Sequence, residues 1–166
     1  MASRRDDGVF DPQGVDWQRV SPRLAAVRRI GSVLASLVPL VPAVVLAVLL
    51  DRWWISLLWL PFAVLLVVRL VVVGRQVAAI GYAEREDDLL VRHGLLFRSL
   101  VVVPYGRMQL VDVQAGPVDR RFGIATVQLH TASAGTDATI PGLPPQEAER
   151  LRDRLASRGE ARLAGL

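Results

Sequence analysis

The sequence contains no cysteine and no lysine, and only two of its 166 residues are histidine. The absence of cysteine excludes disulfides, thiol catalysis and thiolate metal ligands. His93 and His130 together cannot fill a zinc site, so each is expected to be a surface side chain. The sequence also lacks a phosphate-binding loop and the GxGxxG, HExxH and GxSxG motifs. We therefore expect a protein that is not an enzyme and that holds neither a cofactor nor a metal.

Charge is almost absent from two long stretches of the chain. Residues 30–50 carry no charged side chain, and residues 53–73 carry only Arg69. At about 1.5 Å per residue, a helix of either length matches the roughly 30 Å hydrocarbon core of a bilayer. We predict a transmembrane hairpin that turns at Asp51-Arg52, with Arg69 close enough to its end to snorkel to the headgroups. The alternative is a buried hairpin of a soluble protein, but the rest of the chain is too short to cover two apolar helices.

The net positive charge is confined to the membrane-proximal part of the sequence. Residues 1–75 hold nine Arg against five acids, whereas residues 76–166 hold eleven of each, so the first part carries the whole net charge of +4. A nucleic-acid-binding protein would concentrate its basic residues on the folded domain. The pattern instead follows the positive-inside rule and predicts that both termini are cytoplasmic. The arginines that flank the predicted spans on that side are Arg4, Arg5, Arg19, Arg23, Arg28, Arg29 and Arg75.

Serine and proline mark the start of the first predicted helix. Ser21 suits an N-cap and Pro22 suits the first helical position, so the helix is predicted to run from Pro22 through Leu50. Two prolines within it lack a backbone donor, and we expect a kink near residues 36–42. Pro61 is expected to act in the same way on the second helix.

From Val77 onward the hydrophobic period changes from that of a helix to that of a strand. Short runs rich in Val, Leu, Ile and Thr alternate with turn residues, which predicts a small antiparallel barrel or sandwich. In Thr126–Thr131 the alternation places one face in the core and the other in water. The predicted strands are Val77–Glu84, Leu89–His93, Arg98–Val103, Met108–Gln114, Ala125–Thr131 and Ala138–Ile140.

The last predicted element is a helix over Pro144–Ser157. Acidic residues gather near its start and arginines near its end, as the helix dipole favours. A narrow apolar stripe made of Ala148, Leu151 and Leu155 is expected to pack on the strands, and Gly159 is expected to end the helix.

Four segments carry a family resemblance, in the expected order between about Tyr82 and Leu155. With the two preceding helices, they resemble the bacterial pleckstrin-homology-like (PH-like) family with membrane-anchored members. The resemblance implies a two-helix transmembrane hairpin followed by a mainly β PH-like barrel or sandwich of six to seven antiparallel strands, capped by a C-terminal α-helix. The segments are Leu89–Leu96, Val103–Val111, Gln114–Val127 and Ile140–Leu143.

The expected domains follow from these elements. They are a disordered cytoplasmic tail (1–21), a transmembrane hairpin (22–75, with spans at about 30–50 and 53–73), a PH-like domain (76–158) and a tail (159–166). A short linker (74–76) is expected to join the hairpin to the PH-like domain.

The turn residues of these segments suggest structural roles. Gly94 and Gly106 suit turns that need a positive φ, and Pro104 is expected to end a strand. The segment Arg120–Gly123 is expected to form a tight corner with Phe122 buried.

The candidate binding residues are Arg107, Gln109, Arg120 and Arg121. Either the arginines are structural, or Arg107, Arg120 and Arg121 converge on an anionic headgroup or on a partner's carboxylate. PH domains that bind phosphoinositides have basic residues around the first hairpin. Here the corresponding loop, Glu84–Asp88, has four acids against one Arg and would repel phosphate. Three of its acids, Glu86, Asp87 and Asp88, are expected to form a solvated turn rather than a divalent-cation site.

Two functional hypotheses remain. The first is a non-catalytic module of the bacterial cytoplasmic membrane that presents a cytoplasmic PH-like domain to a partner membrane protein. The second is a module that binds anionic lipid headgroups at the inner leaflet. Self-association is also open, because four small residues would allow close helix approach. These are Gly31, Ser32, Ala35 and Ser36. We expect no nucleic-acid partner and know of no small-molecule substrate, and a transporter or membrane enzyme would need residues that the spans lack.

Overall fold

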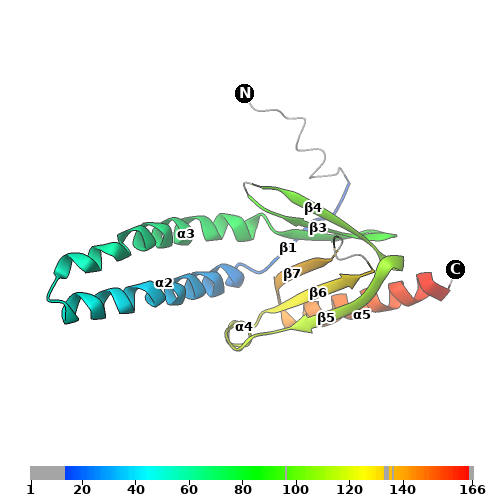
Figure 1. Ribbon diagram of the computed structural model, residues 1–166. Coiled ribbons are helices and arrows are strands. Elements are labelled where there is room, and N and C mark those ends of the chain that lie inside the picture. The colour runs from blue at the N-terminus through cyan, green and yellow to red at the C-terminus, as the bar shows by residue number, and fades with distance from the viewer. Residues whose placement is uncertain (1–13, 96, 133–134, 136, 165–166) are drawn as a thin grey trace, which may run out of the picture. The chain divides into compact units, whose positions relative to one another are not determined.

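The computed structural model describes residues 14–95, 97–132, 135 and 137–164 (Figure 1). The chain divides into two compact units. Residues 25–75 form the helical unit, and the described residues before and after them form the β unit.

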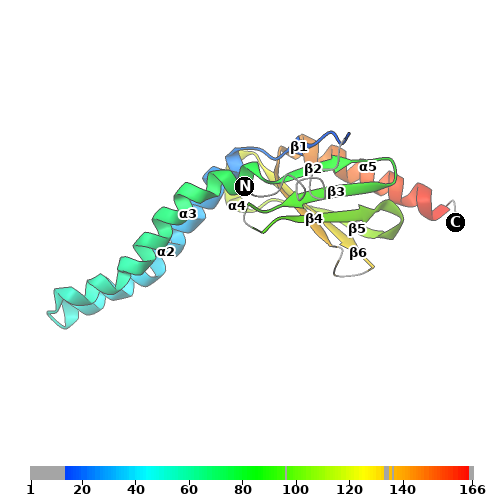
Figure 2. The ribbon, with the colours of Figure 1, turned by 90° about the horizontal axis from the view of Figure 1, so that it is seen from above.

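The helical unit is an antiparallel hairpin. It contains α2 (Arg23–Leu49), the 3-10 helix η1 (Trp53–Trp59) and α3 (Leu60–Ala78). The two long helices run side by side in both views (Figures 1 and 2). Each is long and apolar enough to cross a membrane, and only 6% of the apolar window of each is buried in the protein. A soluble core hairpin would need these side chains to be covered, so the burial favours the transmembrane interpretation.

The second predicted helix differs from the structure at both ends. It starts as a 3-10 helix and becomes α-helical only at Leu60, next to Pro61, which cannot donate an α-helical hydrogen bond. It then continues to Ala78, so the linker predicted at 74–76 and the strand start predicted at Val77 are wrong. Val77, predicted to begin a strand, is instead a buried residue of α3. After Ala78, the first residue that favours the end of a helix is Gly81.

The first helix matches its prediction closely. It is continuous through both prolines. Near the predicted kink, the indole N–H of Trp59 donates to the carbonyl oxygen of Ser36 at 3.0 Å and ties the two arms together.

In the part of the β unit that the structure describes, seven antiparallel strands form two sheets. The first has the order β1-β2-β3-β4 and the second the order β5-β6-β7. Among the described residues the sheets do not close into a barrel, so the unit is a sandwich. The strands are β1 (Gln18–Arg19), β2 (Gly81–Glu84), β3 (Asp88–His93), β4 (Ser99–Pro104), β5 (Met108–Gln114), β6 (Ala125–Thr131) and β7 (Ala138–Leu143).

The core of the β unit is built from the alternation seen in the sequence. In β6, Val127 and Leu129 are buried while Thr126, Gln128 and His130 are more exposed, as predicted. The C-terminal helix α5 (Pro145–Ala164) packs on the second sheet (Figure 2), and its whole predicted stripe is 0% exposed.

Three local predictions are corrected by the β unit. The helix α5 does not end at Gly159 but continues to Ala164, because Gly159 is buried where the helix packs beside the carbonyl oxygen of Tyr105. Gly106 has no positive φ, since it lies in the 3-10 helix η2 (Tyr105–Arg107). The corner at Arg120–Gly123 is the end of a short helix, α4 (Pro117–Phe122), and Phe122 is only half-buried.

The predicted tail, residues 1–21, is partly structured. Residues 1–13 lie outside the described part, but Gln18 and Arg19 form β1 and pair with Tyr82 and Gly81. The side chain of Trp17 is covered by the guanidinium of Arg92, whose central carbon lies 4.5 Å from the ring centroid.

Candidate functional site

One face of α5 carries arginines at intervals of four residues, and they neutralise the acidic β2–β3 loop. Glu84, whose side chain is 7% exposed, lies 2.7 Å from Arg150 and 3.1 Å from Arg154. Arg158 donates to the carbonyl oxygen of Arg85, and Arg162 pairs with Asp87. The acids predicted to form a solvated turn are therefore partly used by α5. Within the described residues, no group of three or more His, Cys, Asp or Glu side chains is placed to hold a metal.

A buried tyrosine joins this ladder to β1. The hydroxyl of Tyr82 lies 2.6 Å from Oε1 of Gln18 and 2.8 Å from Oε1 of Glu147. Burial raises the pKa of Tyr82, and the hydrogen bond from Arg150 lowers the pKa of Glu147. Tyr82 therefore stays neutral as a donor and Glu147 stays ionised as an acceptor, which fits a structural contact between β1, β2 and α5.

The structure separates the predicted binding residues into two groups at opposite ends of β5. Arg107 is exposed in η2, just before β5, and Gln109 lies at the register shift at its start. Arg120 and Arg121 are exposed in α4, beyond the other end (Figure 1). Seven strand residues span about 20 Å, so Arg107 and the α4 arginines do not converge on one ligand.

Arg120 and Arg121 lie at the end of the β unit that continues into the helical unit. We call this the junction end. Here the N–H of Ser21 donates to the carbonyl oxygen of Gly142 at 2.8 Å, and Arg23 donates to that of Phe122 at 3.4 Å. Arg23 is the first residue of α2, so α4 lies beside the point at which the chain enters the first apolar helix. Sequence reasoning missed this neighbourhood, because nearly a hundred residues separate the two segments.

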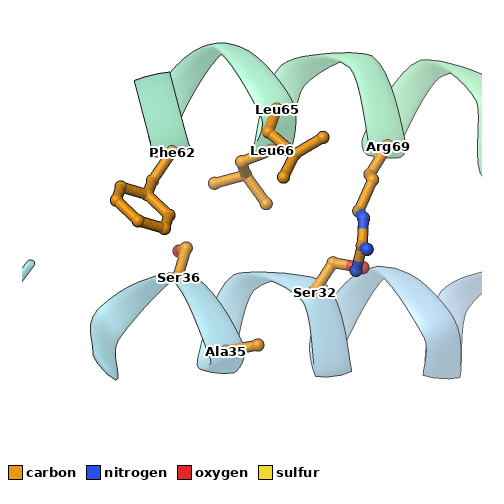
Figure 3. Close-up of a pocket in the computed structure, with 7 residues that line it drawn as sticks. All are labelled: Ser32, Ala35, Ser36, Phe62, Leu65, Leu66 and Arg69. Atoms are coloured by element: carbon orange, nitrogen blue, oxygen red, sulfur yellow. The ribbon is translucent and has the colours of Figure 1, made fainter. Parts of the chain in front are cut away.

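A second polar feature lies inside the hairpin. A cavity of about 160 Å³ lies between α2 and α3. Figure 3 shows the Arg69 side chain extending across it toward Ser32, rather than along the helix. Its remaining lining residues are Ala35, Ser36, Phe62, Leu65 and Leu66. The sequence identified Arg69 only as an arginine able to snorkel.

The outer face of the second sheet is mostly polar, although it also exposes Leu110. Gln114 donates to Asp112 at 2.9 Å, and Nδ1 of His130 lies 3.3 Å from Oδ2 of Asp137. The same Asp137 accepts the backbone N–H of Thr131, which lowers the pKa of that carboxyl. His130 is exposed, as expected, and contacts this nearby carboxylate.

Comparisons with known proteins agree with this architecture. The family model described as Bacterial PH domain matches residues 22–159, which include both apolar helices as well as the β unit. The chain is 32% identical over 146 residues to the UPF0699 transmembrane protein YdbS of Bacillus subtilis (strain 168), a match that covers 83% of this chain and 89% of that protein. No solved structure matches the chain significantly.

Proposed function

The chain belongs to the bacterial PH domain family, and from that premise we propose that it is a non-catalytic module that presents its β unit to a partner membrane protein on the cytoplasmic side. Its membrane association is supported by the two apolar helices and by the similarity to a transmembrane protein. The cytoplasmic side is inferred from the excess of arginine around the outer ends of the hairpin.

The observation that carries the partner hypothesis is Arg69. A charged group within a span is costly and is normally paired. The only acid in residues 30–73 is Asp51, eighteen positions away, or about 27 Å along a helix. The hairpin therefore supplies no carboxylate for Arg69. Small residues on the facing helix leave room beside it, so a helix that carries an Asp or Glu would both fill the cavity and neutralise the charge.

The test is recovery of the partner from native membranes. Photoreactive side chains are placed at Ala35 in the cavity, at Gln128 on the outer face of the second sheet and at Arg121 in α4, and the adducts are identified by mass spectrometry. We expect a recurrent protein adduct that is lost in Arg69→Leu, which leaves the span apolar, and that is retained in Arg69→Lys. Adducts with lipid alone, or a protein adduct unaffected by Arg69→Leu, would contradict the hypothesis.

A second candidate, binding of anionic headgroups, is favoured by the neighbourhood of Arg23, Arg120 and Arg121. Arginines fit phosphate well, and these lie at the end that leads into α2. Native mass spectrometry of the full chain from mixed anionic and neutral nanodiscs would count the retained lipids. We expect fewer anionic lipids on the double variant R120Q/R121Q than on Arg107→Gln, which makes a single charge change at the other end of β5. Equal numbers of retained anionic lipids on the unchanged chain and on both variants would argue against this candidate.

A further inference from the structure

The β3–β4 turn exposes a large aromatic side chain. Phe97 is 92% exposed, and Leu95 in the same turn is 39% exposed. By contrast, the two tyrosines of the β unit, Tyr82 and Tyr105, are 2% and 0% exposed. A single exposed apolar residue is ordinary on a protein surface, so its place in the fold decides whether it has a role.

The turn requires glycine at its start. Gly94 has a φ of +96°, and a Cβ atom there would lie 1.8 Å from the carbonyl oxygen of Phe97. Only glycine fits this conformation. Gly94 therefore allows the backbone at Phe97 to approach closely, and the exposed side chain of Phe97 belongs to this turn.

Strand register places the tip at the junction end. Gly81 pairs with Arg92, and Arg92 pairs with Leu100, so the turn projects beyond Gly81 on the side from which the chain arrives. Only Ala79 and Ile80 separate β2 from α3. The tip therefore lies at the end of the β unit from which α3 enters it, and Ala78, the last residue of α3, follows the apolar stretch 53–73 by only five positions.

We propose that Leu95 and Phe97 insert into the cytoplasmic leaflet and contact lipid hydrocarbon at the interface. The spans hold the β unit at the bilayer, so the tip meets lipid at a high effective concentration. Aromatic residues are favoured at this depth, and the adjacent Arg98, which is exposed, suits the headgroup layer. The chain leaves the β unit into α2 and returns to it from α3, so two chain connections already tie the β unit to the spans. Insertion of the tip adds a third attachment, to the bilayer itself, and this attachment fixes the orientation of the β unit. This inference goes beyond the proposed function, because it concerns apolar insertion and requires neither a partner nor anionic lipid.

The cysteine-free sequence makes the test direct. Ser99, which is exposed beside the tip, is changed to cysteine in the full chain and spin-labelled in nanodiscs that hold one copy. Collision rates with oxygen, which concentrates in lipid, and with a water-soluble nickel chelate report the depth of the label. The same label at Gln128 on the outer sheet face serves as the aqueous reference, and the label at Val67 in α3 as the lipid reference.

We expect the oxygen-to-nickel ratio at Ser99 to lie between the two references in both neutral and anionic nanodiscs. Phe97→Asp in the same labelled chain should move it to the value at Gln128. Loss of one buried Phe corresponds to a change of about 10- to 100-fold in the ratio of inserted to free tips. A Ser99 label as aqueous as Gln128, or one unaffected by Phe97→Asp, overturns the proposal. Because no partner is present, neither result depends on the partner hypothesis.

Discussion

Neutralising Glu84 should loosen α5 from the first sheet. The Glu84 carboxylate is 7% exposed and holds Arg150 at 2.7 Å and Arg154 at 3.1 Å. The substitution Glu84→Gln keeps the shape of the side chain and removes the charge, so two arginines lose their shared partner.

The free energy that Glu84→Gln is expected to remove from the contact between α5 and β2 lies between two limits. Removing one partner of a fully buried ion pair costs about 3–5 kcal/mol, whereas an exposed pair contributes about 0–1 kcal/mol. The partner arginines are 39% and 49% exposed, and Arg150 keeps Glu147 at 2.5 Å. The Arg154 contact is ionic without good hydrogen-bond alignment, because Oε2 of Glu84 has no hydrogen-bond partner. We therefore expect a loss of about 1–2 kcal/mol, a factor of about 5–30 in the opening equilibrium of α5.

Amide hydrogen exchange of the full chain in nanodiscs measures this directly. We expect exchange within α5 (Pro145–Ala164) to accelerate by that factor, with little change in the spans. The matched control is Glu149→Gln, the same change at an exposed site on the same helix. Unchanged exchange in Glu84→Gln, or equal acceleration in both variants, would refute the assignment of Glu84 as the anchor of the arginine ladder.

Three further predictions concern other contacts. Arg150 lowers the pKa of Glu147, so this contact stabilises the fold above the unfolded value of about 4.5 and is lost as the pH falls through the folded value. Protection factors at the start of α5, which correct for the pH dependence of intrinsic amide exchange, should therefore fall in acid, and a flat profile would contradict this. Gly142→Ala should destabilise the junction end by about 2–4 kcal/mol in thermal unfolding, because φ is +76° and the new Cβ would lie 2.8 Å from that of Leu24, whereas Gly135→Ala, with no atom within 4 Å, should be nearly neutral. A single cysteine at Gly106 should react with an impermeant maleimide only after cells are opened, and labelling of intact cells would place the β unit outside.

Local patterns predicted most elements because each follows from neighbouring residues. The stripe on α5, the alternation in β6 and the two long apolar helices all follow from local sequence patterns, and the structure confirms them. The errors arose where a distant contact overrides local preference. Gly159 continues a helix because it is buried where α5 packs beside Tyr105, and the two residues of β1 form a strand because β2 offers them an edge.

The candidate site was less predictable for the same reason. Sequence reasoning grouped Arg107 with Arg120 and Arg121 by residue type, but the length of β5 keeps them apart. Arg23 and Phe122 meet only through the fold. A signal for α4 was present in Gly116-Pro117 followed by Asp119, whose carboxylate accepts the N–H of Gly116 at 3.1 Å, as at a helix start.

The β unit has little net charge, but its charged side chains are distributed unevenly between its two ends. This distribution bears on how the β unit is oriented toward the bilayer. Residues 76–166 sum to zero, yet the acids of the β2–β3 loop are matched by the arginines of α5, at the end of β2 away from the junction. Arg120 and Arg121 are exposed at the junction end, near Arg23. An anionic leaflet would attract that end electrostatically and would also meet the apolar tip at Phe97. Salt weakens the first attraction and leaves the second, so high salt should release bound anionic lipid without withdrawing the tip from the bilayer.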